Sequence, residues 1–260
     1  MRRAARNSIS DAFADRTVLV TGAGGGIGRH VVQILHDCGA EVIASDVSDQ
    51  AILGLPGRHV PMDVTDQESV TRSVASIEDL DGLVLAHGIT ALGRADEVPM
   101  DAVERVVAVN LVGSARVTRA TLPGLLRRRG RISVLSSVAG FGPLVHRSAY
   151  SASKHGVHGY FDSLRAECAR EGLGVTVVAP GFVATDIGQH AAFASPSEAQ
   201  HRTTTGVQLG PEHVATVILE GMARRRRLVL VGPTARQARL LHRVAPAAYE
   251  RVMARRVLRA

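Results

Sequence analysis

The chain lacks residue types and segments that define whole classes of protein. It has no tryptophan, only 3% aromatic residues, and two cysteines, Cys38 and Cys168, which form no CxxC pair. A disulfide scaffold is therefore excluded, and the two thiols are predicted to be buried and reduced in a cytoplasmic protein without a metal site. No apolar run reaches the roughly 18 residues of a spanning helix. Residues 1–16 are basic without the apolar centre of a secretory signal, which predicts a frayed N-terminal leader.

Acidic residues are scarce at the C-terminal end. The formal net charge is +7, but residues 223–260 contain eleven Arg and one acidic residue, Glu250, which amounts to +10. The rest of the chain carries −3. The excess of basic residues therefore belongs to the tail, and no nucleic-acid groove across the domain is indicated.

Short apolar segments alternate with amphipathic segments along the chain. Long helices are expected over 100–129 and 147–171, and a shortened crossover over 47–57. Strands that are apolar throughout are buried on both faces, which predicts an α/β fold: a doubly wound, seven-stranded parallel sheet of Rossmann type with helices on both faces. This single domain is expected over 17–232, before a basic amphipathic tail over 233–260. The predicted strands are 17–21, 41–45, 58–64, 81–88, 131–137, 174–180 and 227–232.

A glycine-rich turn, "TGAGGGIG", follows the first strand and precedes a helix. Gly22 permits the tight turn, Gly26 lets the backbone approach a pyrophosphate, and Gly28 lets the helix pack close to the sheet. Ile27 stands at the start of the helix, where backbone N–H groups face phosphates. The alternative, a loop that binds no ligand, is disfavoured because a strand precedes the turn, a helix follows it and an acid lies downstream.

Asp46 closes the second strand, 18 residues after Gly28. A carboxylate at this position accepts hydrogen bonds from adenosine ribose hydroxyls and repels a 2′-phosphate. No arginine follows at once, so NAD is predicted in preference to NADP. The alternative is that Asp46 caps the next turn.

Lysine is almost absent, because only Lys154 among the 31 basic residues is a lysine. Tyr150 stands four positions earlier, on the same helical face, and Ser137 ends a predicted strand. A phenol of ordinary pKa, about 10, is a poor base, and a nearby ammonium is expected to lower the pKa of Tyr150. Lysine is also a compact donor that can bond ribose hydroxyls. A chance Tyr–Lys pair on a solvated helix is the alternative, which the glycine turn and Ser137 oppose.

With these motifs, the chain resembles a short-chain dehydrogenase/reductase over roughly residues 17–232. The resemblance also rests on Asn110 in "VAVNLVG", on "MDVTD" at 62–66 and on "PGFVAT" at 180–185. It implies a helix bend and a relay water at Asn110. It further implies a cofactor site that contains Asp63 at the adenine with Val64 beside it, close approach at Gly88, and a nicotinamide turn formed by Pro180, Gly181, Val183 and Thr185.

The segment after the fourth strand departs from the family pattern. The family has Asn-Asn-Ala-Gly, whereas this chain has Leu85-Ala86-His87-Gly88. Gly88 retains the close approach to the cofactor. His87 either replaces the amide hydrogen bonds that brace the strands or is only packed there, and packing is the favoured interpretation.

The resemblance implies an NAD(P)-dependent oxidoreductase that moves a hydride between nicotinamide and a secondary alcohol or ketone. Tyr150 would be the general base, Ser137 would stabilise the reacting oxygen, Lys154 would anchor the ribose and Asn110 would complete a water relay. A homodimer or homotetramer built on the two long helices is also implied. The alternative is a non-catalytic dinucleotide sensor or scaffold that uses the basic tail for a partner or a membrane.

The substrate is predicted from two apolar segments, 139–148 and a lid at about 186–208. They favour a hydrophobic steroid, retinoid or lipid-like molecule, unless they pack only on one another. In the tail, apolar residues recur near helical period and arginines lie largely off that face. Such a stripe suits peripheral contact with an anionic membrane, or a helix pair that covers the substrate mouth or packs on another subunit. The apolar positions are Leu241, Val244, Ala248, Val252 and Met253.

Overall fold

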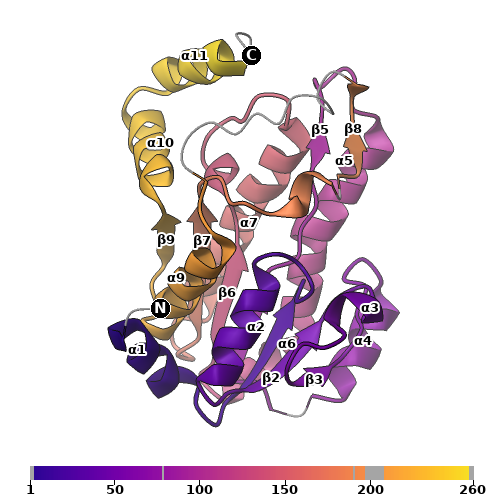
Figure 1. The fold of residues 1–260 in the computed structure, drawn as a ribbon, viewed down its shortest axis with the longest axis vertical. Helices are drawn as coiled ribbons and strands as arrows, with labels where there is room; N and C mark the ends of the chain where they lie inside the picture. The colour runs from indigo at the N-terminus through magenta and orange to yellow at the C-terminus, as the bar shows by residue number, and fades with distance from the viewer. Residues whose placement is uncertain (1–2, 78, 190, 197–207, 258–260) are drawn as a thin grey trace.

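A seven-stranded, wholly parallel sheet forms the centre of the molecule (Figure 1). The computed structural model describes residues 3–77, 79–189, 191–196 and 208–257, with side chains up to 255. The strand order is β3-β2-β1-β4-β6-β7-β9, which confirms the predicted doubly wound fold. The strands are β1 (Thr17–Thr21), β2 (Glu41–Ser45), β3 (Arg58–His59), β4 (Gly82–Leu85), β6 (Arg131–Leu135), β7 (Gly174–Pro180) and β9 (Leu228–Val231).

The strand order reverses direction at β1, which pairs with β2 on one side and β4 on the other. In a doubly wound sheet, ligands bind beyond the carboxyl ends of the strands at such a switch point. Thr21 is in register with Ser45 and with Leu85, so three strand ends meet at this edge. The residues that follow these strands are therefore brought together.

Two apolar layers cover the sheet, one on each face. One layer contains α2 (Gly28–Asp37) and α9 (Pro211–Ala223), and the other contains α4 (Gln67–Ala75), α6 (Ser114–Arg127) and α7 (Ser148–Glu167). All residues of β4 and β7 are buried, as expected for strands that are covered on both faces.

The crossover between β2 and β3 is short, as predicted. It contains only the single turn α3 (Asp49–Ile52). The edge strand β3 is shorter than the predicted 58–64. Val60 N–H still donates to the carbonyl of Ala44, and Met62 N–H donates to that of Asp46, but Pro61 between them has no N–H. The ladder therefore becomes irregular after His59.

The N-terminal segment is a packed helix, so the prediction of a frayed leader was wrong. Helix α1 (Arg3–Phe13) places Ile9 and Phe13 in the core, where both are fully buried in the layer that contains α2 and α9. The Arg131 guanidinium carbon also lies 5.7 Å from the centre of the Phe13 ring. Ala5, Ile9 and Phe13 recur every four residues, which aligns them on one helical face.

The predicted helix over 100–129 contains three segments, and the one over 147–171 is α7. A π-helical turn, η1 (Ala108–Gly113), separates α5 (Met100–Val107) from α6. Asn110 lies in this wider turn.

Part of the predicted lid over 186–208 folds against the main domain. It contains the turn η3 (Asp186–Gly188) and strand β8 (Phe193–Ala194), which pairs in parallel with β5 (Ala91–Leu92). Residue 190 and residues 197–207 of this prediction lie outside the described residues.

The tail forms two helices, α10 (Pro233–Val244) and α11 (Pro246–Val257), which lie at the upper left in Figure 1. Tyr249 of α11 is buried beside Gly142, in the loop that follows β6. The tail thus packs on its own chain near the carboxyl end of the sheet. No helix in the part of the chain that the structure describes has the length and apolar character to cross a membrane.

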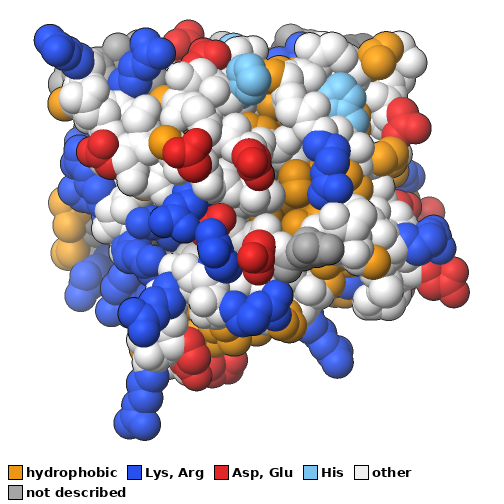
Figure 2. Space-filling model, turned by 90° about the horizontal axis from the view of Figure 1, so that it is seen from below, with side chains coloured by type: hydrophobic (Ala, Val, Ile, Leu, Met, Phe, Trp, Pro, Cys, Tyr) orange, Lys and Arg blue, Asp and Glu red, His pale blue; other side chains and the backbone are white. Residues whose placement is uncertain are grey.

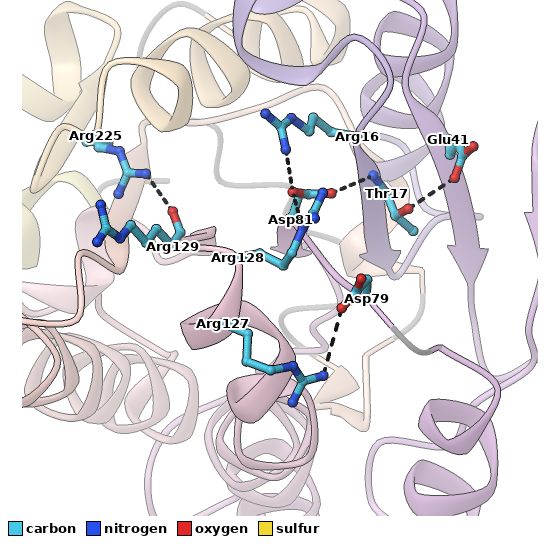
Figure 3. Close-up of polar contacts among 9 residues, drawn as sticks. All are labelled: Arg16, Thr17, Glu41, Asp79, Asp81, Arg127, Arg128, Arg129 and Arg225. Carbon is cyan, nitrogen blue, oxygen red and sulfur yellow. Dashed lines mark hydrogen bonds and ion pairs between the residues drawn. The ribbon is translucent and has the colours of Figure 1, made fainter.

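Asp81 organises the opposite edge of the sheet, where the strands begin (Figure 3). Its carboxylate accepts hydrogen bonds from Thr17 N at 3.2 Å and from Arg16 and Arg128, each at 3.1 Å. These bonds tie the start of β1 and the end of α6 to β4. Seen from below, arginine side chains gather over one side of this face (Figure 2).

We predict that Phe13→Ala lowers the free energy of unfolding by about 3 kcal/mol, because it opens a cavity under α1. Urea unfolding would measure this loss. Asn7→Ala, which changes an exposed residue of the same helix, is the matched control and should leave stability nearly unchanged. Equal stability of Phe13→Ala and wild type would contradict the packed position of α1.

Candidate active site

The glycine turn after β1 is closed tightly against the segment after β4. Gly22 has a φ of +67°, and a Cβ there would lie 2.4 Å from the backbone nitrogen of His87. A Cβ at Gly28 would lie 2.0 Å from the carbonyl oxygen of Gly22. Neither position has space for a side chain, and α2 begins at Gly28, directly after Ile27. The turn therefore presents backbone N–H groups at the start of a helix, as a phosphate site requires.

The turn after β7 lies across from the glycine turn. A Cβ at Gly26 would lie 3.0 Å from the Thr185 Cγ2 atom. The segment after Pro180 is held by two backbone hydrogen bonds: Gly181 N–H donates to the Val231 carbonyl, and Thr185 N–H donates to the Val183 carbonyl. The structure thus brings together two segments that the sequence predicts to bind the pyrophosphate and the nicotinamide of one dinucleotide.

Asp46 directly follows β2 and is hydrogen-bonded to the glycine turn. Its Oδ2 atom accepts from Gly24 N at 3.0 Å, and its Oδ1 atom accepts from Val47 N at 2.8 Å. The N-cap residue of α3 is Ser48, so Asp46 is not the cap of the next helix. Each carboxylate oxygen has a second lone pair that can accept from a ligand hydroxyl.

Asp63 and Val64 lie beyond the edge strand β3. The Asp63 Oδ1 atom accepts from the backbone N–H and the hydroxyl of Thr65, at 2.8 and 2.7 Å. The Val64 carbonyl accepts from Arg116 at 2.6 Å. Asp63 thus stabilises its own turn, while Val64 is held against α6.

Asn110 is buried in the π-helical turn and connects two parts of the site. Its Oδ1 atom accepts from Ile89 N at 2.9 Å, and its Nδ2 atom donates to the Ile89 carbonyl at 3.0 Å and to Ser153 Oγ at 2.9 Å. The Ser153 hydroxyl in turn donates to the carbonyl of Tyr150. The segment after β4 is therefore fixed to the first turns of α7.

Ser137, Tyr150 and Lys154 converge at the carboxyl end of β6. Ser137 accepts a hydrogen bond from Ala139 N at 3.2 Å and also bonds the Tyr150 hydroxyl. Lys154 is buried, and its Nζ atom donates to the Leu135 carbonyl at 2.7 Å. This atom lies 5.6 Å from the centre of the Tyr150 ring. The three side chains thus form one cluster, as the sequence predicts.

The electrostatics of this cluster differ from the prediction. Burial raises the pKa of Tyr150, and the hydrogen bond from Ser137 and the charge of Arg147 only partly oppose this rise. Lys154 was predicted to lower the pKa of Tyr150, but its ammonium is directed at the Leu135 carbonyl. Burial also lowers the pKa of Lys154 itself, to about 8. Arg147 was missed from the sequence, although it stands one helical turn before Tyr150.

Gly88 lies close against this cluster. A Cβ there would lie 3.2 Å from Asn110 Oδ1 and 3.5 Å from Lys154 Nζ. A side chain at this position would fill the space next to both polar groups. The absence of one is consistent with the predicted close approach of a ligand.

His87 braces the strands, so the favoured interpretation of simple packing was wrong. Its Nδ1 atom lies 2.6 Å from the Thr21 hydroxyl, and its Nε2 atom lies 3.1 Å from that of Ser114. Ser114 donates its own proton to the Asn110 carbonyl, so we assign Nε2–H as the donor and Nδ1 as the acceptor. Burial and the charge of Lys154 lower the pKa of His87 to about 3, which keeps the ring neutral.

We predict that His87→Leu lowers the free energy of unfolding by about 2 kcal/mol near neutral pH, because buried hydroxyls lose a partner. The unfolded histidine binds a proton below its ordinary pKa of about 6.5, which the folded one does not. The stability that the neutral His87 contributes to wild type is therefore lost as the pH falls from about 6.5 toward 3. The difference in the free energy of unfolding between wild type and His87→Leu should shrink accordingly.

Urea unfolding at about pH 7 and about pH 5 would measure this change. His213→Leu, at an exposed position on α9, is the control and should show no such trend. A constant difference between wild type and His87→Leu at both pH values would contradict a neutral, hydrogen-bonded His87.

Comparison with known proteins identifies the family of the chain. The family described as short chain dehydrogenase matches residues 16–194. The chain is 32% identical over 262 residues to the Dehydrogenase/reductase SDR family protein 7-like of Anopheles gambiae, covering 93% of this chain and 83% of that protein. It is 31% identical to Dehydrogenase/reductase SDR family member 7B of Bos taurus, covering 98% of this chain and 83% of that protein.

Solved structures share the fold. A short-chain dehydrogenase from Burkholderia cenocepacia J2315, in complex with NADP, has a TM-score of 0.82 at 22% identity and covers 92% of this chain and 98% of its own. One from Burkholderia phymatum, in complex with NAD, has a TM-score of 0.78 at 24% identity, with coverages of 91% and 96%. The family match and the sequence relatives show that the chain belongs to the short-chain dehydrogenase/reductase family of NAD(P)-dependent oxidoreductases.

Proposed function

We propose that this protein interconverts a secondary alcohol and a ketone with NAD as the cofactor and with Ser137, Tyr150, Lys154 and Asn110 as its catalytic residues. The observation that carries the proposal is the convergence of a half-buried phenol, a buried amine and a serine hydroxyl beside Gly88. The alternative of a non-catalytic sensor or scaffold gains no support from the described part of this site.

Tyr150 is the proton-transfer group of the proposed reaction. In alcohol oxidation it takes the hydroxyl proton, and in ketone reduction it returns that proton to the carbonyl oxygen. The Ser137 hydroxyl donates to the same oxygen and stabilises the charge that develops there. Because burial raises the pKa of Tyr150, the phenol is protonated near neutral pH, which supports the reductive direction.

Lys154 and Asn110 support Tyr150 in different ways. The Lys154 amine is held at the end of β6 by the Leu135 carbonyl, and from there it anchors the ribose. With a pKa of about 8, Lys154 can also exchange a proton. Asn110 fixes Ser153 and the segment at Ile89, and we assign to it the relay water that the family resemblance implies.

The cofactor site extends from the adenine side to the nicotinamide side of the switch point. A bound nicotinamide supplies or accepts the hydride. The glycine cradle fits a dinucleotide, because a Cβ at several of its positions would meet backbone atoms. We assign phosphate binding to Gly22, Gly26, Ile27 and Gly28, adenosine binding to Asp46, Asp63 and Val64, and the nicotinamide side to Gly88, Tyr150, Lys154, Pro180, Gly181, Val183 and Thr185.

We assign to this site a hydrophobic substrate, such as a steroid, retinoid or lipid-like molecule, because apolar residues pack next to Tyr150. Ala149 belongs to a buried cluster with Ala91 and Val106, and Ala192 and Phe193 of the lid segment pack against it. The lid segment therefore packs partly on the chain itself. Its position supports an apolar substrate that would lie between this cluster and Tyr150.

A homodimer or homotetramer is also proposed, and a groove between η1 and α7 supports it. Its lining is mainly apolar and includes Leu111, Val112 and Tyr160. Gly159 of α7 has no atom within 4 Å of the position of a Cβ, so the helix is open to a partner there.

We predict that Tyr150→Phe lowers kcat at least about 100-fold while NAD binding is retained, because only the proton-transfer group is removed. Turnover of secondary alcohols would be followed at the nicotinamide absorbance, and NAD binding by calorimetry. Tyr160→Phe on the same helix is the matched control. Wild-type turnover by Tyr150→Phe would remove its proposed role.

We predict that Asp46→Ser raises the ratio of kcat/KM for NADP over NAD by about 100-fold, because a carboxylate no longer repels the 2′-phosphate. Serine keeps an acceptor for Gly24 N. Asp49→Ser, which removes an exposed carboxylate nearby in α3, is the control. An unchanged ratio in Asp46→Ser would show that Asp46 does not determine the cofactor preference.

A further inference from the structure

The two tail helices expose apolar side chains that the other described residues do not cover. Leu240 and Val244 of α10 have exposed fractions of 66% and 74%, and Leu241 and Val252 have 36% and 37%. These four residues are called the tail surface below. They account for four of the nine large hydrophobic side chains that are exposed in the described part of the chain. An apolar patch concentrated on one short segment indicates an interaction site.

Positive charge accompanies the tail surface. Arg236 and Arg243 of α10 and Arg251 and Arg255 of α11 are exposed. Within the described residues, none of these four arginines takes part in an ion pair. Glu250 is the one acidic residue of the whole tail. No carboxylate in the described part of the chain therefore forms an ion pair with these guanidinium groups.

The tail is fixed to the body of the molecule. Tyr249 and Met253 are buried, and a Cβ at Gly142 would lie 3.0 Å from the Tyr249 ring. Arg239 lies over the Phe141 ring, at 5.7 Å from its centre. The inward side of the tail thus packs on the loop between Ser137 and Tyr150, and the tail surface consists of residues that this packing leaves exposed.

We propose that the tail surface is a docking site for an anionic phospholipid bilayer. Apolar side chains would enter the boundary between headgroups and acyl chains, and the arginines would bind the lipid phosphates. Charge argues against a second copy of this chain as the occupant, since residues 233–260 carry seven arginines and one acid, a net charge of +6, and two such tails would repel one another. The docked tail would hold the loop beside Tyr150 close to the lipid.

Vesicle flotation of the full chain tests this proposal without substrate or cofactor, so its result is independent of the proposed reaction. We expect binding to phosphatidylcholine vesicles that contain phosphatidylglycerol, and little binding to pure phosphatidylcholine. The triple variant Arg236→Ser/Arg243→Ser/Arg251→Ser should lower the partition coefficient about 100-fold. Leu240→Ser/Val244→Ser, at exposed positions, should lower it at least about 10-fold.

Two matched variants distinguish binding through the tail surface from nonspecific electrostatic or hydrophobic binding to vesicles. Arg170→Ser/Arg226→Ser/Arg227→Ser removes the same charge from exposed residues at the opposite edge of the sheet. Leu53→Ser/Met100→Ser changes residues with exposed fractions of 69% and 66% elsewhere. Both should bind vesicles as wild type does. Equal losses in control and tail variants, absent vesicle binding, or a change of oligomeric state in Leu240→Ser/Val244→Ser would overturn the proposal.

Discussion

The close contact between the glycine turn and the segment after β4 is the constraint on which the site depends. Gly22 and His87 approach so closely that a single Cβ at Gly22 would overlap the His87 backbone. This contact joins the carboxyl ends of β1 and β4 at the point where the strand order reverses. The neutral His87 ring then bonds Thr21 on one side and Ser114 on the other. Protonation of Nδ1 would remove the acceptor for the Thr21 hydroxyl, and loss of the ring would break both bonds.

A continuous chain of hydrogen bonds extends from this contact to the proposed catalytic tyrosine. The Ser114 hydroxyl accepts a hydrogen bond from His87 and donates one to the Asn110 carbonyl. The Asn110 amide donates to the Ser153 hydroxyl, which donates to the Tyr150 carbonyl. The turn that would hold phosphates and the helix that would move the proton are thus positioned by one network. Such a network rigidifies a site because its central members, Asn110, Ser114 and Ser153, are buried.

Charge is distributed so that the two ends of the sheet differ. At the starting edge, Asp81 binds Arg16 and Arg128, and their charges are partly neutralised. At the carboxyl edge, the tail brings exposed arginines next to the loop that connects Ser137 with Tyr150. The buried amine of Lys154 is separated from both groups, and burial rather than these arginines lowers its pKa. The arginines of this chain therefore affect contacts at its surface more than the proposed reaction.

Much of the fold and of the candidate site could be predicted from local patterns. Strand and helix periods, the glycine spacing and the separation of Tyr150 from Lys154 are local properties, so the sequence by itself determined the doubly wound sheet and the cluster at its switch point. Other features depend on residues far apart in the chain, and only the tertiary structure decided them. Ile9 and Phe13 are buried because α9 provides a surface for them. His87 connects β1 to α6 because the Thr21 and Ser114 hydroxyls lie on either side of its ring. Burial decided the direction of the Tyr150 pKa, since desolvation depends on every segment that excludes water from the phenol.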